Sequence, residues 1–111
     1  MIAWLGRVLG IDPIYGGVPR SPLWRHVRAQ HLKLNPYCFV CGDKGSLLQK
    51  VEVHHCVPYS VDKSLELKGN NLITLCRRCH LIFGHLGSFA SYNPTIKPDA
   101  QEWRVKISKR P

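Results

Sequence analysis

The sequence has few acidic residues and no long apolar run. Asp and Glu total 7 against 16 Lys and Arg in 111 residues, for a formal net charge of +9. No apolar stretch approaches the roughly 18 residues that a transmembrane helix needs. Residues 1–10 (MIAWLGRVLG) carry their one charge at Arg7, inside the apolar stretch, and so lack the layout of a secretory signal. We therefore expect a cytoplasmic protein that does not span a membrane.

The excess of positive charge favours an anionic partner. Nucleic acid and an anionic membrane surface both suit it, and a merely soluble basic protein is the alternative. The basic residues do not form one tail, because one group precedes the first cysteine and another closes the chain. The groups are Arg7, Arg20, Arg25, Arg28 and Lys33, and then Lys97, Arg104, Lys106, Lys109 and Arg110. A fold that brings both ends to one side would make a positive cradle.

The length predicts one small domain. Such a chain buries only about 60–70% of its unfolded surface, which favours a metal or disulfide staple. Residues 10–22 contain three Gly and three Pro, so we expect an N-terminal arm over residues 1–20. The folded domain is predicted over residues 21–92. A basic C-terminal extension, packed on the domain or trailing from it, is predicted over residues 93–111.

Apolar spacing and turn residues predict a small α+β fold. Ser21-Pro22 resembles a helix N-cap followed by proline at the first helical position. The predicted elements are a basic helix over 23–34, a strand over 46–54, a strand over 72–75, a helix over 77–86 that Gly87 ends, and a last strand or strapped tail over 103–108. The central order is therefore strand, loop, strand, helix.

Four of the five cysteines form two Cys-x-x-Cys pairs. The pairs are Cys38/Cys41 and Cys76/Cys79, with 34 residues between them. A two-residue spacer lets both sulfurs face one ion, so the pairs predict a tetrahedral structural Zn²⁺. Disulfides and a redox-active pair are the alternatives. A reducing compartment argues against disulfides, and the presence of two such pairs argues against a redox-active pair. Cys56 is predicted to be a buried small apolar residue.

Two further motifs lie around the second pair. Residues 52–58 read Glu-Val-His-His-Cys-Val-Pro, and residues 71–80 read Asn-Leu-Ile-Thr-Leu-Cys-Arg-Arg-Cys-His. With Asn35-Pro36-Tyr37-Cys38 and the basic helix before it, this order resembles the zinc-stapled HNH endonuclease family over residues 22–86. The resemblance implies a ββα-metal fold and metal-dependent DNA hydrolysis that leaves 5′-phosphate and 3′-hydroxyl ends.

The histidines of these motifs suit that chemistry. Phosphodiester hydrolysis needs a base for the attacking water and charge neutralisation at the phosphoryl oxygens. Histidine can be the base because its ordinary pKa is near 6.5, and on a strand His54 and His55 point to opposite faces. The resemblance implies that His55 is the general base and that Asn71 holds the loop that orients it. It also implies that His54 and His80 bind one catalytic divalent ion, which is Mg²⁺, Mn²⁺, Ni²⁺, Co²⁺ or Zn²⁺.

The family's pattern leaves one ligand open. Some members have a further metal-binding histidine four residues after the one that His80 matches, but here that position is Gly84 and His85 follows. Five residues of an α-helix turn about 500°, which points His85 about 140° away from His80. His85 is a third ligand only if the helix ends or distorts there. Otherwise it contacts DNA phosphate or caps the helix C-terminus.

The sequence therefore predicts a metal-dependent DNA endonuclease, whose partner is DNA and not a membrane. Contacts to the phosphate backbone are expected from Arg25, Arg28, Lys33, Arg77 and Arg78. Trp4, Trp24 and Trp103 are expected to anchor the core. One alternative is a non-catalytic zinc-stapled DNA-binding module, and another is an accessory subunit of a phage or mobile-element machine.

Overall fold

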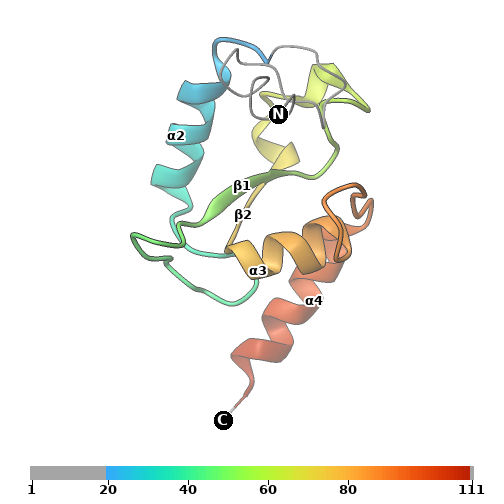
Figure 1. The fold of residues 1–111 in the computed structure, drawn as a ribbon. Helices are drawn as coiled ribbons and strands as arrows, with labels where there is room; N and C mark the ends of the chain where they lie inside the picture. The colour runs from blue at the N-terminus through green and yellow to red at the C-terminus, as the bar shows by residue number, and fades with distance from the viewer. Residues whose placement is uncertain (1–19, 111) are drawn as a thin grey trace.

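The computed structural model describes residues 20–110, which form a two-stranded sheet with helices on both faces (Figure 1). The arm predicted over residues 1–20 lies outside this range except for Arg20. Helix α2 packs on one face of the sheet, and the helical segments that follow the sheet pack on the other. Within residues 20–110, no helix is long and apolar enough to cross a membrane.

Helix α2 spans Trp24–Leu34, close to the predicted 23–34. The predicted N-cap is wrong, because the chain turns once more before the helix starts. The Ser21 hydroxyl accepts a hydrogen bond from the backbone N–H of Leu23, which lies before the first helical residue. None of the residues in α2 is fully buried, so the helix lies on the surface of the molecule.

The sheet consists of β1 (Glu52–His55) and β2 (Leu72–Leu75), which pair antiparallel with His55 opposite Leu72. The second strand is where the sequence predicts it. The first is shorter than the predicted 46–54, because residues 46–49 form a turn in which the Ser46 N–H donates to the Gln49 carbonyl at 2.9 Å. The loop between the strands contains two short 3₁₀ helices, Lys63–Leu65 and Gly69–Asn71.

The segment after β2 is helical but changes its winding. A single α-helical turn, α3 (Arg77–Cys79), continues directly into a π-helix over His80–Gly84. The predicted helix over 77–86 therefore begins at the expected residue, but regular α-helical winding over that whole range is wrong.

The last element is helix α4, Ile96–Ser108, and not the predicted strand or tail. Pro98 suggests irregular structure, but it occupies the first turn, where a backbone N–H has no intrahelical partner to lose. Ile96 and Ala100 lie one turn apart and are both fully buried, so they attach α4 to the core. Glu102 and Lys106 add an ion pair at 2.9 Å on its exposed side.

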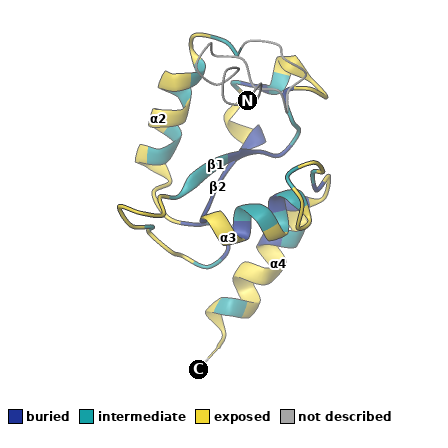
Figure 2. Cartoon of the chain, viewed as in Figure 1, coloured by how far each residue is buried: buried dark blue, intermediate teal, exposed yellow. Residues whose placement is uncertain are grey.

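The core lies between the sheet, the loop after α2 that carries Cys38 and Cys41, and α4 (Figure 2). Its buried members are Cys38, Val40, Cys56, Ile73, Leu75, Cys76, Cys79, Ile96 and Ala100. Cys56 is buried among them, which confirms its predicted role as a small core residue. With a two-stranded sheet and helices in one small unit, the predicted α+β class is confirmed.

Candidate metal centres and active site

The four paired cysteines meet at one point. Cys38 and Cys41 come from the loop after α2, while Cys76 and Cys79 flank the first turn of α3. Their sulfurs lie within 4.8 Å of one another and are free thiols. The sulfurs of Cys41 and Cys76 are 3.7 Å apart. Tetrahedral zinc with Zn–S bonds of about 2.3 Å separates its sulfurs by about 3.8 Å, so the cluster fits Zn²⁺.

Electrostatics within the cluster favours a thiolate. The thiol of Cys79 hydrogen-bonds to the Cys38 sulfur and lowers the pKa of Cys38 to about 4. The same interaction raises the pKa of Cys79, because a proton there is shared with the neighbouring thiolate. Since zinc binds the deprotonated sulfur, one ligand is already in its binding form at neutral pH.

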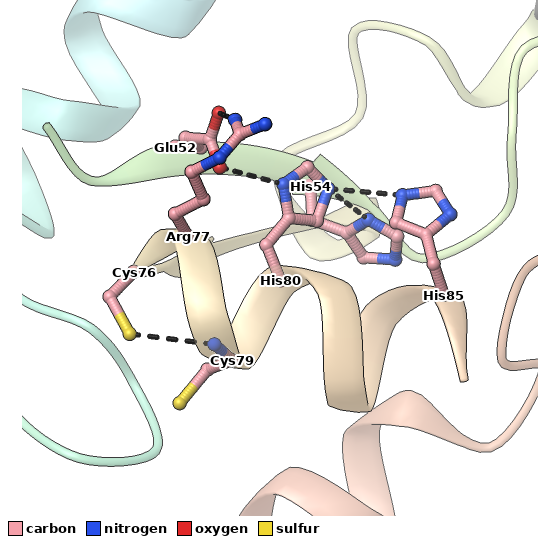
Figure 3. Close-up of polar contacts among 7 residues, drawn as sticks. All are labelled: Glu52, His54, Cys76, Arg77, Cys79, His80 and His85. Atoms are coloured by element: carbon pink, nitrogen blue, oxygen red, sulfur yellow. Dashed lines mark hydrogen bonds and ion pairs between the residues drawn. The ribbon is translucent and has the colours of Figure 1, made fainter. Parts of the chain in front are cut away.

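Three histidines form a second cluster between β1 and the π-helix (Figure 3). His80 Nε2 lies 3.0 Å from His54 Nδ1 and 3.1 Å from His85 Nε2. Metal–nitrogen bonds of about 2.1 Å at right angles place two ligand nitrogens about 3.0 Å apart. The spacing of the three rings therefore fits a divalent ion.

The π-helix is what brings His85 into this cluster. Its backbone hydrogen bonds pair residues five apart, so His80 and His85 lie on one face. The helix is distorted here, which is the condition under which the sequence predicts that His85 reaches the same ion. Gly84 is packed against the ring of His54, where a Cβ would lie 3.0–3.2 Å from the ring atoms. A side chain at residue 84 would displace His54.

Two outer contacts fix the protons of this cluster. His80 Nδ1–H donates to Glu52 Oε1 at 3.1 Å, and His85 Nδ1–H donates to the Ser91 carbonyl at 2.6 Å. In the neutral rings both Nε2 atoms then carry lone pairs, and these face each other. Such lone pairs repel unless a cation lies between them. The pattern of a ligand histidine whose second nitrogen donates to a carboxylate or carbonyl is typical of metal sites.

Protonation of His54 or His80 is disfavoured as the source of positive charge between the rings. Burial, and then the neighbouring histidines, lower the pKa of His54 to about 3. Burial also lowers the pKa of His80, although Glu52 opposes the shift. In addition, His54 Nε2 is buried without a hydrogen-bond partner within the described structure. Lowered pKa values keep His54 and His80 neutral, which is the form of histidine that binds metal.

His55 points to the other face of β1, toward α2. Its Nε2–H donates to the Glu66 carbonyl at 3.0 Å, and because a carbonyl only accepts, the basic nitrogen is Nδ1. The ring of Trp24 lies against it, with ring centroids 4.4 Å apart. Burial lowers the pKa of His55 to about 4, with Arg20 lowering it further and the Glu66 contact opposing. His55 is therefore neutral throughout the physiological range.

Asn71 connects the ends of the loop that carries Glu66. Its side-chain Oδ1 accepts from the Val57 N–H at 2.8 Å. Its Nδ2 donates to the carbonyls of Val57 and Leu65, at 3.0 and 3.1 Å. Because Leu65 precedes Glu66, this buried amide fixes the carbonyl that orients His55.

The predicted DNA-contacting residues fall into two groups. Arg25, Arg28 and Lys33 are exposed on α2, whereas Arg77 and Arg78 are exposed on α3. Arg77 also forms an ion pair with Glu52 at 3.5 Å, beside the histidine cluster.

Sequence reasoning assigned no role to Glu52, Glu66 or Trp24 as neighbours of the site. Glu52 had a usable signal, since it lies two residues before His54 and thus on the same face of the strand. Glu66 acts through its backbone carbonyl, which no residue type predicts. Trp24, expected as a core anchor, is half-buried against His55.

An antiparallel pair of strands followed at once by a helix, with histidines between them, is the arrangement of the ββα-metal fold. Residues 38–85 match the sequence model of the HNH endonuclease family. The chain therefore contains an HNH endonuclease domain, and its cysteine cluster fits the zinc-binding type of that family. Neither the curated proteins nor the solved structures include a match to this chain.

Proposed function

We propose that this protein is a metal-dependent DNA endonuclease that hydrolyses phosphodiester bonds. The observation that carries the proposal is the cluster of His54, His80 and His85, in which the Nε2 lone pairs of His80 and His85 face each other and would be stabilised by a cation between them. His55 follows His54 directly in β1. Although the two side chains point to opposite faces, both lie at the end of β1. A phosphate at this strand end would contact a cation held by the cluster on one side and a water next to His55 on the other.

His54, His80 and His85 are the proposed ligands of the catalytic divalent ion, with Glu52 and the Ser91 carbonyl orienting two of the rings. When bound, the ion would supply Lewis-acid stabilisation of charge on the phosphoryl oxygens and on the leaving 3′ oxygen. Three imidazoles favour Ni²⁺ or Zn²⁺ over Mg²⁺, which prefers oxygen ligands. The cysteine cluster is assigned to a separate structural Zn²⁺.

His55 is the proposed general base, and it acts through Nδ1. The Glu66 carbonyl holds the proton on Nε2, so Nδ1 is the atom that accepts the proton of the attacking water. The same carbonyl stabilises the positive charge that develops on the ring. Asn71 fixes the loop behind that carbonyl, and Trp24 restricts the rotation of the ring. Both are positioning residues.

DNA is the proposed substrate because both the positive net charge of the chain and its match to the HNH endonuclease family favour it. The chain carries a net charge of +9, and exposed Arg25, Arg28 and Lys33 extend along α2. Contacts from such side chains to phosphates bind DNA of any sequence. By analogy with the family, the products are 5′-phosphate and 3′-hydroxyl ends.

The test is relaxation of a supercoiled plasmid by zinc-loaded protein over a titration of each of the five candidate metals. His55→Ala should slow cleavage about 10²–10⁴-fold at every metal concentration, with little change in DNA binding. His54→Ala, His80→Ala and His85→Ala should weaken metal binding, and added metal should partly restore cleavage. His26→Ala, which removes an exposed histidine on α2, is the matched control.

Two results would contradict parts of this proposal. Full activity in His55→Ala would remove His55 as the base. A wild-type protein that binds DNA and cuts it with none of the metals is a non-catalytic DNA-binding module, and the nuclease proposal then fails.

A further inference from the structure

Two leucines at the tip of the loop before β1 are almost completely exposed. Leu47 is 93% and Leu48 96% exposed, more than any other large apolar residue in the described part of the chain. They occupy the centre of the turn that Ser46 and Gln49 close. Central turn positions usually hold Gly, Asn, Asp, Pro or Ser, so an apolar pair there has no local structural reason.

The turn holds these leucines in a fixed position. The Gln49 N–H donates to the Ser46 hydroxyl at 3.0 Å, and the Gly45 N–H donates to Asp43 Oδ1 at 2.8 Å. The two arms of the loop are in contact, since a Cβ at Gly45 would lie 2.9 Å from the nitrogen of Val51. With φ of +75° at Gly45, only glycine suits that position. The two leucines therefore project from a loop that is held in place by hydrogen bonds and by a close backbone contact.

Charge on the same loop favours an anionic partner. Lys44 and Lys50 flank the turn, while the nearby Asp43 carboxylate is engaged with the Gly45 N–H. The exposed loop projects beside the start of β1 (Figure 2). Two leucine side chains are far too small for a stable protein interface, which needs about 800 Å² on each partner. One or two apolar side chains are, however, enough to open a base step in the minor groove of DNA.

We propose that Leu47 and Leu48 form a wedge that inserts between base pairs and kinks the DNA, with Lys44 and Lys50 on the adjacent phosphates. This inference rests on DNA as the substrate in the proposed function. Leu48 lies six positions before His54, and an extended chain spans at most about 20 Å over that length. The kink therefore lies within about six base pairs of the phosphate at the histidine cluster, at 3.4 Å per step.

The experiment measures the bend directly. A 30-base-pair duplex with a fluorescent donor and acceptor at its ends is saturated with the His55→Ala protein, in which cleavage is slow, and no divalent ion is added. Energy transfer should rise on binding, because a kink shortens the end-to-end distance. With Leu47→Ser and Leu48→Ser added, the rise should disappear. Affinity should change less than about tenfold, because the gain from burying the leucines and the cost of unstacking are similar in size.

Two controls separate the wedge from general binding. Leu34→Ser removes a leucine of α2 that is 68% exposed, and it should leave the bend unchanged. Lys44→Gln with Lys50→Gln should reduce the slope of log K against log salt by about 1.8 while the bend at saturation persists.

The proposal is overturned by equal energy transfer with and without the leucines, or by no bend in the His55→Ala protein. It is also overturned if the leucine substitutions convert a dimer into a monomer in sedimentation, because the pair then joins two copies of the chain. Cleavage is not needed for the bend. A wild-type protein that kinks DNA without cutting it supports the wedge and refutes the nuclease, and one that cuts without a leucine-dependent kink does the reverse.

Discussion

His80 Nε2 lies 3.1 Å from His85 Nε2, although the two histidines are five positions apart in sequence. A regular α-helix would turn their side chains about 140° apart, and the π-helix over His80–Gly84 removes that difference. The two rings belong to one cluster with His54 only because of this local winding. The geometry of the candidate metal site thus depends on the backbone as much as on the identity of the ligands.

Loss of the cysteine cluster should unfold the domain. Purified protein should hold one tightly bound zinc, and Cys76→Ser should remove it, because a structural zinc contributes on the order of 10 kcal/mol to folding. Elemental analysis and circular dichroism measure metal content and fold. Cys56→Ala is the control, since Cys56 is buried outside the cluster and its replacement should retain the zinc. Folded wild-type protein without zinc would contradict the assignment.

Removing the carboxylate behind His80 should weaken metal binding without removing a ligand. Glu52→Ala is expected to lower the affinity of the histidine cluster about 10–100-fold, the usual effect of losing such an outer contact. Glu52→Gln should restore part of it, because its amide oxygen still accepts from Nδ1. Isothermal titration of zinc-loaded protein with Ni²⁺ gives the affinity. Arg77→Gln, which removes the ion pair with Glu52 and the contact with the Phe89 ring but leaves the carboxylate in place, should bind normally. An unchanged affinity in Glu52→Ala would refute the role.

A methyl group at residue 84 should disturb the same cluster from the other side. In Gly84→Ala the new Cβ would meet the His54 ring at 3.0–3.2 Å, so the ring must shift and metal affinity should fall at least tenfold. Gly69→Ala is the matched control, because a Cβ there meets nothing within 4 Å. Both variants are measured by the same titration. Equal affinities would show that the cluster accommodates the methyl group.

The basic side chains of α2 should contribute to DNA binding through charge alone. Replacing Arg25, Arg28 or Lys33 by Gln should reduce the slope of log K against log salt by about 0.9 for each phosphate that is no longer neutralised. The weakening should be similar on unrelated duplex sequences. Fluorescence anisotropy at several salt concentrations measures the slope. Lys106→Gln, whose lysine pairs with Glu102, serves as control; a change in sequence preference alone would contradict a backbone contact.

The buried His55 should make the protein sensitive to acid. Its pKa is lowered to about 4 in the folded state, whereas the unfolded chain takes up a proton near pH 6.5. The unfolded state therefore binds more protons between these values, and stability is lost as pH falls below 6.5. Between pH 7 and pH 5 the loss should be about 2 kcal/mol. Urea unfolding of wild type and His55→Phe at both pH values isolates the contribution of His55 to the free energy of unfolding. A difference between the two proteins that does not change with pH would exclude this contribution.

The parts of the molecule that sequence could predict are those fixed by local spacing. The apolar pattern of α2, the strand 72–75 and the two Cys-x-x-Cys pairs all depend on neighbours a few residues away. The predicted strand over 46–54 fails in its first half because Gly45 and the Ser46–Gln49 turn outweigh the apolar residues there. Helix α4 is missed because Pro98 looks like an interruption, although it costs nothing in a first turn.

The candidate site is predictable to a similar degree. The motif alone brings His54, His55, Asn71 and His80 into consideration, and the fold places them around one strand end. Two further features depend on contacts that sequence does not encode locally. The carbonyl of Glu66 reaches His55 across eleven residues, and Trp24 reaches the same ring from a helix that lies more than twenty residues earlier.

The ring of His54 fills the space in which a side chain at residue 84 would lie. The π-helical turn over His80–Gly84 and a larger residue at position 84 therefore exclude each other. A histidine four residues after His80 would project from an evenly wound α-helix and would need the volume that the His54 ring fills here. Ligand spacing and helix winding are therefore linked choices. A sequence with His-x-x-x-Gly-His at this point predicts a π-helical turn, and one with His-x-x-x-His predicts an α-helical turn. Because a π-helical turn contains one residue more than an α-helical turn, an alignment that matches the ligand histidines of the two needs a one-residue gap inside the turn.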